Sequence, residues 1–253
     1  MERRKAIPVE AVLTHKKQLT PDVIELHYEP LIPFDFDPGQ FISIFVPGKG
    51  PGGRDLRRAY SIASAPELSR NGNRLLELCI KVVEGGPGTE YLNAMKIGET
   101  LKGLAPYGDF VYKTKNHRHV VFVATGTGIA PFRSMVNSNV YIENKPLSTT
   151  LLFGARAKED LLYHDELTHS LGKTGFVPVL SKASDWDGFK GRVTDWLRHH
   201  QAKMHWKQTD FYLCGNGAMI DEVKRILTEA EIEKTSIHQE VYFKPKAGEL
   251  HAN

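Results

Sequence analysis

Residues 120–134 read VVFVATGTGIAPFRS, and this stretch decides the fold of the C-terminal half of the chain. An apolar, β-branched run ends at two glycines, Gly126 and Gly128, and a helical pattern follows with a proline in its first turn. A strand that enters a helix through glycines brings free backbone N–H groups and the positive end of the helix dipole together. The stretch therefore predicts a binding site for a dinucleotide pyrophosphate. Its predicted contact residues are Thr125, Gly126, Thr127, Gly128 and Pro131.

The same rhythm of strand and helix continues through the rest of this half. Apolar strand patterns cover 119–125, 149–154, 176–181 and 210–215, helical patterns cover 130–140, 158–171, 193–200 and 218–232, and 236–243 ends the series as a strand. Alternation of this kind is typical of βαβ units around a parallel sheet. We therefore expect an α/β parallel-sheet nucleotide-binding domain over residues 119–253.

The N-terminal half has a different pattern. Short β segments separated by turn residues cover 8–15, 22–29, 39–46, 58–64, 74–83 and 98–105. Several strands at short spacing favour an antiparallel barrel or sandwich over residues 1–114. The polar linker at 113–118 separates this half from the next, so the sequence predicts two domains.

Composition excludes several classes of protein. The 253 residues are 41% hydrophobic and 25% charged, and 33 Lys and Arg against 30 Asp and Glu leave a net charge of +3, which disfavours disorder and nucleic-acid binding. Two cysteines, Cys79 and Cys214, cannot hold an iron–sulfur cluster, and no metal-ligand spacing such as HExxH occurs. The chain has no signal peptide and no apolar run of about 18 residues, so we expect a cytoplasmic protein without a membrane segment.

Cations follow the later strands of the predicted parallel sheet. Arg156 stands where dinucleotide folds that prefer NAD carry an acidic residue, and a cation there accommodates the 2′-phosphate of NADP. Ser181, Lys182 and Arg192 come within reach of the same strand edge. The sequence therefore favours NADP(H) over NAD(H).

Six motifs occur in an order that resembles the ferredoxin–NADP reductase family. They are RAYS at 58–61, LCIK at 78–81, GPGT at 86–89, GTGIAPFRS at 126–134, CGNGAM at 214–219 and EVY at 240–242. The resemblance covers nearly the whole chain. It implies an N-terminal antiparallel β-barrel that binds FAD and a C-terminal domain that binds NADP, in agreement with the two patterns above.

The resemblance also implies roles for the residues of the first three motifs. Arg58 would neutralise the FAD pyrophosphate, Tyr60 would lie against the isoalloxazine ring, and Ser61 would hydrogen-bond near flavin N5. Thr89 stands where the family usually has serine, which keeps the hydroxyl. The other FAD-binding residues that the resemblance implies are Ala59, Cys79, Ile80, Lys81, Gly86 and Gly88.

At the nicotinamide end, the resemblance implies that Cys214 lies near the reacting carbon, with Glu240 and Ser61 completing the polar surroundings. Tyr242 falls where relatives carry a terminal tyrosine that stacks on the flavin, which makes it both a catalytic and an FAD-binding candidate. The chain continues beyond Tyr242, so Phe243 is an alternative stacking ring, and the tail to Asn253 is an alternative cover for the adenine. Gly215 and Met219 complete the implied NADP-binding residues.

The function implied is hydride transfer between nicotinamide C4 and flavin N5, and electron transfer to a separate carrier protein, ferredoxin or flavodoxin. Such carriers are acidic, and Arg54, Arg57 and Lys81 are candidates for the basic patch that would meet them. Two alternatives stay open. One is an NADH-dependent oxygenase reductase component or a flavin reductase, because LSK at 180–182 and WDG at 186–188 resemble that version of the segment. The other is an electron-relay subunit without turnover of its own. We expect a monomer.

Overall fold

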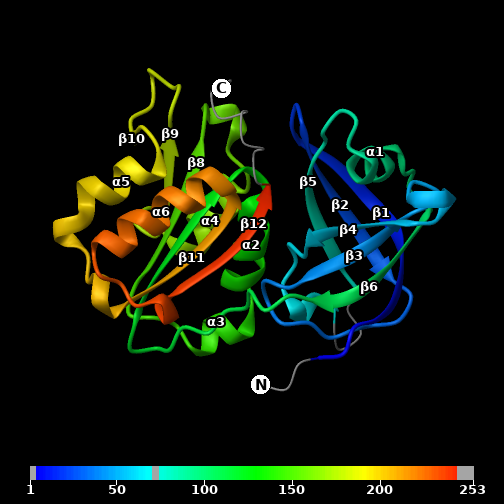
Figure 1. Ribbon diagram of the computed structural model, residues 1–253, viewed down its shortest axis with the longest axis horizontal. Coiled ribbons are helices and arrows are strands. Elements are labelled where there is room, and N and C mark those ends of the chain that lie inside the picture. Colours follow the sequence, from blue (N-terminus) through cyan, green and yellow to red (C-terminus); the bar gives the residue numbers. More distant parts are fainter. Residues whose placement is uncertain (1–3, 70–73, 244–253) are drawn as a thin grey trace. The chain divides into compact units, whose positions relative to one another are not determined.

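The computed structural model describes residues 4–69 and 74–243, and the chain forms two compact units. The first unit contains the chain up to Tyr112 together with Ala130–Glu143, and the second contains Lys113–Ile129 and the chain from Asn144 onward (Figure 1). The expected domain boundaries, 1–114 and 119–253, stay a prediction. The contacts add that residues 130–143 pack with the first unit.

The first unit is built on a six-stranded antiparallel sheet with the order β4-β3-β6-β1-β2-β5. An isolated antiparallel bridge between Ile62 and Leu78 joins the two outer strands, so the sheet curls into the expected barrel. The strands are β1 (Ile7–Thr20), β2 (Val23–Pro30), β3 (Phe41–Val46), β4 (Leu56–Ser61), β5 (Leu76–Lys81) and β6 (Thr100–Tyr107).

The barrel core follows from alternating apolar residues along these strands. Leu26 and Tyr28 on β2 point inward together because side chains two residues apart share a face of a strand. Both are completely buried, as are Ile42 and Ile44 on β3. Burial of these side chains supplies the main favourable free energy of folding.

In the part of this unit that the structure describes, the α-helices are α1 (Pro87–Ala94), α2 (Ala130–Val136) and α3 (Asn139–Glu143). The sequence pattern predicted one helix over 130–140, and the structure corrects this to two. The cause is Ser138, whose hydroxyl donates to the Met135 carbonyl (2.7 Å) and accepts from the Tyr141 N–H (3.2 Å), which ends α2 and starts α3. Short 3₁₀ turns occur at Pro51–Gly53 and Pro66–Ser69.

The second unit is built on a six-stranded parallel sheet with the order β10-β9-β8-β7-β11-β12. All four predicted strands and the closing strand are present, which confirms the α/β class. The strands are β7 (His119–Thr125), β8 (Thr149–Ala155), β9 (Phe176–Leu180), β10 (Phe189–Lys190), β11 (Thr209–Asn216) and β12 (Ile237–Phe243).

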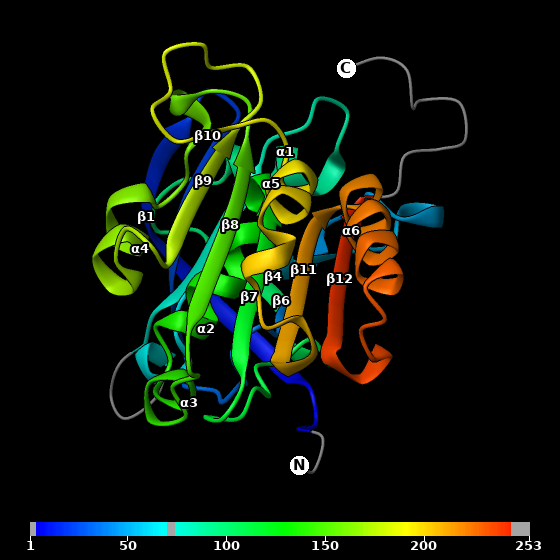
Figure 2. The same ribbon diagram turned by 90° about the vertical axis from the view of Figure 1, so that its left-hand side faces the viewer.

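Helices α5 (Val193–His200) and α6 (Gly217–Glu229) lie together on one face of this sheet (Figure 2). The pattern at 158–171 predicted one helix, whereas a 3₁₀ turn at Lys158–Asp160 precedes α4 (His164–Leu171). Tyr163 separates them because its backbone is left-handed (φ 54°). Further 3₁₀ turns lie at Gly126–Ile129, Gln201–Lys203, Trp206–Gln208 and Lys234–Ser236.

The predicted linker is tied to the second unit at both ends. The Lys113 N–H donates to the Tyr212 hydroxyl (2.9 Å), and Arg118 Nε donates to Asp210 Oδ1 (2.8 Å). Within the described ranges, no helix is long and apolar enough to cross a membrane.

Replacement of a barrel core residue should destabilise the chain far more than replacement of an exposed apolar residue. Leu26→Ala should lower the free energy of unfolding by about 2–5 kcal/mol, because it leaves a cavity in the core. Ile32→Ala, at a side chain that is 76% exposed, should change it by less than about 0.5 kcal/mol. Urea denaturation followed by circular dichroism checks both, and equal losses would contradict the assigned core.

Candidate active site and nucleotide loops

The expected flavin-binding residues of the RAYS motif lie on β4. Arg58 and Ala59 are exposed, Tyr60 is half-buried and Ser61 is buried. Tyr60 packs against the barrel core, and burial raises the pKa of its phenol to about 12. Tyr60 therefore keeps its proton at neutral pH and presents an uncharged aromatic ring beside the Arg58 guanidinium.

The N-terminus of α1 packs directly against this pair. A Cβ atom at Gly88 would lie 2.6 Å from the Tyr60 hydroxyl oxygen and 2.8 Å from Arg58 Cγ, so only glycine fits. Gly86 precedes the helix and Pro87 occupies its first position. The N–H groups of a first helical turn lack acceptors within the helix, and the dipole favours anions there. A guanidinium beside a closely packed helix N-terminus fits the pyrophosphate of FAD.

Thr89, whose expected role at the FAD pyrophosphate stays a prediction, also has a structural role in the turn before α1. Its hydroxyl donates to the Gly86 carbonyl (3.1 Å) and accepts from the Val83 N–H (3.1 Å). The Thr89 side chain therefore holds the turn that leads into α1. This structural role had no signal in the sequence, because a Gly-Pro-Gly-Thr motif does not specify which acceptor the hydroxyl chooses.

Cys79, Ile80 and Lys81 form the end of β5, an outer strand of the described sheet. Cys79 and Ile80 are buried, and Lys81 is exposed with its ammonium 2.8 Å from Asp22 Oδ2. This hydrogen bond holds the pKa of Asp22 below its usual value. The charge of Lys81 is therefore partly compensated, which weakens its place in a basic patch.

In the second unit, the predicted phosphate loop follows β7. Residues 126–129 form a 3₁₀ turn before α2, in which Pro131 lies buried. A Cβ atom at Gly128 would lie 2.5 Å from the Cys214 carbonyl oxygen, so a side chain there would separate the loop from β11. The Asn216 N–H also donates to Thr125 Oγ1 (3.2 Å). The structure thus brings the two motifs GTG and CGN together at the carboxyl ends of β7 and β11.

Asn216 also caps α6, because its side-chain oxygen accepts from the Ala218 N–H (2.8 Å). Gly215 lies near the end of β11, directly before this cap, and Met219 lies in the first turn of α6. A second helix N-terminus therefore starts at the carboxyl edge of the parallel sheet, where dinucleotides bind in folds of this type.

The predicted 2′-phosphate residues gather at the same edge of the sheet. The Ser181 N–H donates to the Ala155 carbonyl (3.1 Å), and the Lys182 N–H donates to the Arg156 carbonyl (2.8 Å), which joins the ends of β8 and β9. Arg192 directly precedes α5, whose Val193 would lie 3.0 Å from a Cβ atom at Gly154 on β8. The ends of β8 and β9 and the start of α5 therefore place Arg156, Lys182 and Arg192 at the same edge of the parallel sheet.

Two other residues at this edge were missed by sequence reasoning. Lys158 pairs with Asp185 (2.9 Å) and lies over the Trp186 ring. Asp185 therefore places a carboxylate in the loop that follows the predicted cations. No signal in the sequence could assign this pair, because 27 residues separate its members.

The nicotinamide-end residues Cys214, Glu240 and Tyr242 lie on adjacent strands. Cys214 on β11 is paired in register with Glu240 on β12, and Tyr242 follows two residues later. Cys214 is completely buried, and burial together with the Glu240 carboxylate raises the pKa of its thiol well above its usual value. It therefore stays a neutral thiol. Ser61, the fourth predicted catalytic residue, lies on β4 of the first unit.

Two predictions about the end of the chain fall outside the described residues. Nothing describes the Phe243 side chain or residues 244–253, so the alternative stacking ring and the tail over the adenine stay predictions. Tyr242 is 40% exposed, which leaves its ring accessible to a ligand.

Comparison with known proteins assigns the class that this architecture defines. The family described as "Oxidoreductase FAD-binding domain" matches residues 10–112, and the family described as "Oxidoreductase NAD-binding domain" matches residues 122–225. A ferredoxin–NADP reductase B from Sorangium cellulosum is 33% identical over 248 residues, which cover 94% of this chain and 98% of that protein. The chain belongs to the ferredoxin–NADP reductase family: it is an NAD(P)H-dependent flavoprotein oxidoreductase with FAD as its cofactor.

Other relatives have different roles. The reductase component of a phenol 2-monooxygenase from a Pseudomonas species is 31% identical over 247 residues, which cover 93% of this chain and 67% of that protein. Among solved structures, a ferredoxin NADP⁺ reductase from Neisseria gonorrhoeae has a TM-score of 0.76 at 22% identity and is covered completely, with 95% of this chain matched. A cytochrome P450 reductase from Amycolatopsis has a TM-score of 0.80 at 24% identity. The match covers 96% of this chain and 71% of the Amycolatopsis chain. These structures share the fold.

Gly88→Ala should weaken FAD binding at least tenfold, because the added methyl group displaces the Tyr60 hydroxyl and Arg58 from the helix N-terminus. A loss of about 1.4 to 2 kcal/mol is about ten- to thirtyfold in affinity. Fluorescence titration of the flavin-free protein with FAD measures the dissociation constant. Asn93→Ala, an exposed change on the same helix, is the matched control. Unchanged affinity in Gly88→Ala would contradict the placement of the pyrophosphate.

Proposed function

We propose that this protein transfers electrons from NADPH, through FAD, to a separate one-electron carrier protein, ferredoxin or flavodoxin. The observation that carries the proposal is the close packing at Gly88, where the N-terminus of α1 contacts Arg58 and Tyr60. The near full-length similarity to a ferredoxin–NADP reductase supports the choice of acceptor. The two cysteines of the sequence support a separate carrier, because they cannot ligate a cluster themselves.

When bound, FAD supplies the conversion of a two-electron hydride from the nicotinamide into single electrons. The residues of the chain hold and orient the reactants. Arg58 and the α1 N-terminus offset the pyrophosphate charge, and Tyr60 offers an uncharged ring for the flavin. Cys214 keeps a neutral, completely buried thiol beside the Glu240 carboxylate, so the strand end proposed for the nicotinamide carries no reactive thiolate. Ser61 and Tyr242 keep their proposed catalytic roles.

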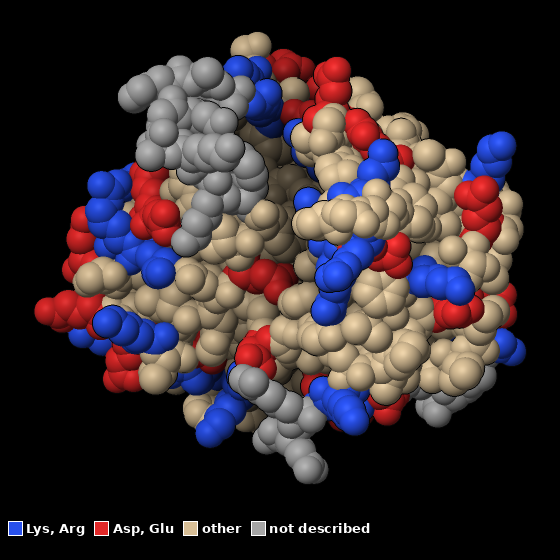
Figure 3. Space-filling view, turned by 45° about the vertical axis from the view of Figure 1, so that its right-hand side comes forward, with Lys and Arg blue, Asp and Glu red and all other residues tan. Residues whose placement is uncertain are grey.

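The carrier would dock through local charge. Basic and acidic side chains are interspersed on the face shown in Figure 3, in keeping with a net charge of only +3. Among the three candidates, Lys81 pairs with Asp22, and Arg57 donates to Ser43 Oγ (3.0 Å) while staying exposed. Arg54 is exposed as well. An acidic carrier would therefore meet Arg54 and Arg57 rather than a broad basic surface.

A second candidate function is that of an oxygenase reductase component that uses NADH. The similarity to a phenol 2-monooxygenase reductase component supports it, and so does Asp185. A carboxylate beside Lys158 would repel a 2′-phosphate and lower the preference for NADPH. We favour NADPH because Arg156, Lys182 and Arg192 approach the same edge.

The carrier test is a stopped-flow experiment with the FAD-loaded protein. We expect NADPH to bleach the flavin absorbance, and ferredoxin or flavodoxin to be reduced at least about a hundredfold faster than with free FAD, since binding orients the reactants. Carrier reduction no faster than with free FAD would overturn the choice of acceptor.

The nucleotide test compares kcat/KM for NADPH and NADH. Arg192→Gln should lower the NADPH value by about 10- to 100-fold and leave the NADH value nearly unchanged, because a charge-assisted hydrogen bond contributes about 1.5–3 kcal/mol. Arg198→Gln is the matched control, since Arg198 lies on α5, the helix that Arg192 precedes, and pairs with Glu222. Equal losses with both nucleotides would contradict a 2′-phosphate contact at Arg192.

A further inference from the structure

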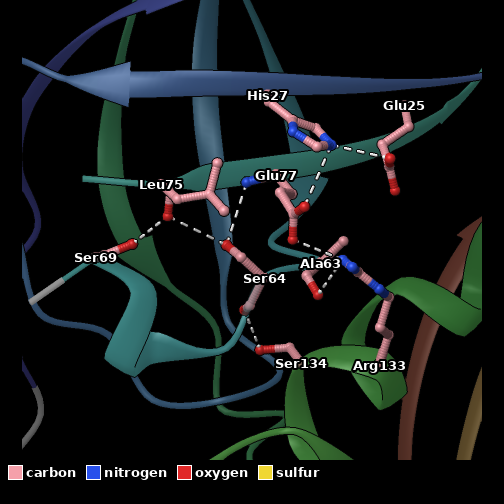
Figure 4. A network of polar contacts seen from close by, with 9 residues as sticks. All are labelled: Glu25, His27, Ala63, Ser64, Ser69, Leu75, Glu77, Arg133 and Ser134. Atoms are coloured by element: carbon pink, nitrogen blue, oxygen red, sulfur yellow. Dashed lines mark hydrogen bonds and ion pairs between the residues drawn. The ribbon is translucent and has the colours of Figure 1, made fainter. Parts of the chain in front are cut away.

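Two buried carboxylates lie on neighbouring strands of the first unit, Glu25 on β2 and Glu77 on β5 (Figure 4). His27 lies between them, because it is two residues after Glu25 and is paired in register with Glu77. Its Nε2 is 2.9 Å from Glu25 Oε1 and 3.2 Å from Glu77 Oε1. On the other side, Arg133 Nη1 from α2 is 2.7 Å from Glu77 Oε2.

Arg133 supplies one positive charge to this network. Two buried carboxylates carry two negative charges, and an uncompensated buried charge is strongly unfavourable. Protonated His27 supplies the second positive charge at the point that both carboxylates share. Among the residues that the structure describes, His15 on β1 also faces the imidazole, with ring centroids 5.1 Å apart.

The pKa of His27 is raised above its ordinary value of 6.5. The hydrogen bond to Glu25 is the largest cause, and the charges of Glu77 and Glu25 add to it. Burial and the Arg133 guanidinium act in the opposite direction. The cluster therefore keeps the imidazolium to a higher pH than an isolated histidine does.

The same network joins two segments that the proposed flavin site uses. The Glu77 carbonyl accepts from the Ala63 N–H (2.8 Å), and its N–H donates to Ser64 Oγ (3.1 Å). Arg133 also donates to the Ala63 carbonyl (3.2 Å), and the Ser134 hydroxyl donates to the Ser64 carbonyl (2.7 Å). Residues 62–64 directly follow the RAYS motif, and Glu77 is two residues before Cys79.

We propose that His27, Glu77 and Arg133 are positioning residues that hold the two flavin-binding segments together, and that protonation of His27 makes FAD retention depend on pH. This inference rests on the proposed flavin site and names a regulation of it. FAD affinity depends on pH through His27 because FAD binding, which needs the two segments held in place, favours the formed network and hence the imidazolium; this gain in affinity is lost as pH rises through the raised pKa. FAD should therefore bind most tightly at a pH below the raised pKa of His27 and less tightly at a pH above it.

A divalent cation is the competing way to neutralise the carboxylates. Glu25, His27 and Glu77 each offer one ligand atom, and these atoms lie within 4.8 Å of one another. However, Arg133 already occupies the second oxygen of Glu77, and its charge would repel a metal ion. We therefore assign the position to a proton.

The first experiment measures the FAD dissociation constant from pH 6 to pH 9 in three proteins. In the wild type it should rise roughly three- to tenfold, since a pKa shift of one unit corresponds to a factor of ten. His27→Gln, which keeps a hydrogen-bond donor without the charge, should be flat over this range and close to the high-pH wild type. His15→Gln, the matched control on β1, should keep the wild-type slope. A wild-type slope in His27→Gln would overturn the proposal.

The second experiment titrates the histidines of the wild-type chain by NMR, and it stays informative even where a variant does not fold. His27 should titrate above 6.5, and Glu77→Gln should lower its pKa. Titration at or below 6.5, or micromolar Zn²⁺ binding that His27→Gln abolishes, would overturn the assignment. Neither readout uses a nicotinamide nucleotide or a carrier protein. Failure of these two experiments is therefore distinguishable from failure of carrier reduction, which would contradict the proposed function alone.

Discussion

Glu77 is a charge that the first unit must neutralise in its interior, and the surrounding structure is arranged accordingly. A carboxylate at 4% exposure is tolerated only with cations and hydrogen-bond donors on several sides. Arg133 reaches it from α2, His27 from β2, and the chain after β4 through backbone hydrogen bonds. One buried group thus fixes the relative placement of two barrel strands and a helix, near the point where the bridge between Ile62 and Leu78 closes the barrel.

The two candidate ligand sites share one structural feature. In each, the backbone at a glycine packs so closely against neighbouring atoms that an added methyl group would clash with them. Gly88 lets the start of α1 rest on Arg58 and Tyr60, and Gly128 lets the loop after β7 rest on the carbonyl of Cys214. Both glycines are buried, and each lies at the turn where a strand or loop enters a helix. Such sites recognise phosphates by backbone geometry, so they tolerate changes in the residues around the glycines.

The sequence predicted the architecture well, because strand periodicity and glycine turns are local. The parallel sheet, the antiparallel barrel and the motif positions at the strand ends followed from patterns within about fifteen residues. The pattern at 130–140 failed where one hydroxyl, Ser138, ended a helix. The charge network was missed for another reason: Arg133 and Glu77 are 56 residues apart, and nothing in either motif indicates a partner. Likewise Lys158 and Asp185 meet only through folding. The assignment of roles to Arg58, Cys214 and Tyr242 came from the family resemblance.

The interleaving of the two units along the chain affects biosynthesis. The barrel strands end with Tyr107, yet α2 and α3 of the same unit are translated only after the linker and β7. At roughly 5–20 residues per second, the ribosome needs a few seconds to add the remaining residues up to Glu143. During that interval the nascent barrel contains Glu77 but not Arg133. Until Arg133 is added, the Glu77 carboxylate lacks the guanidinium that pairs with it in the folded unit.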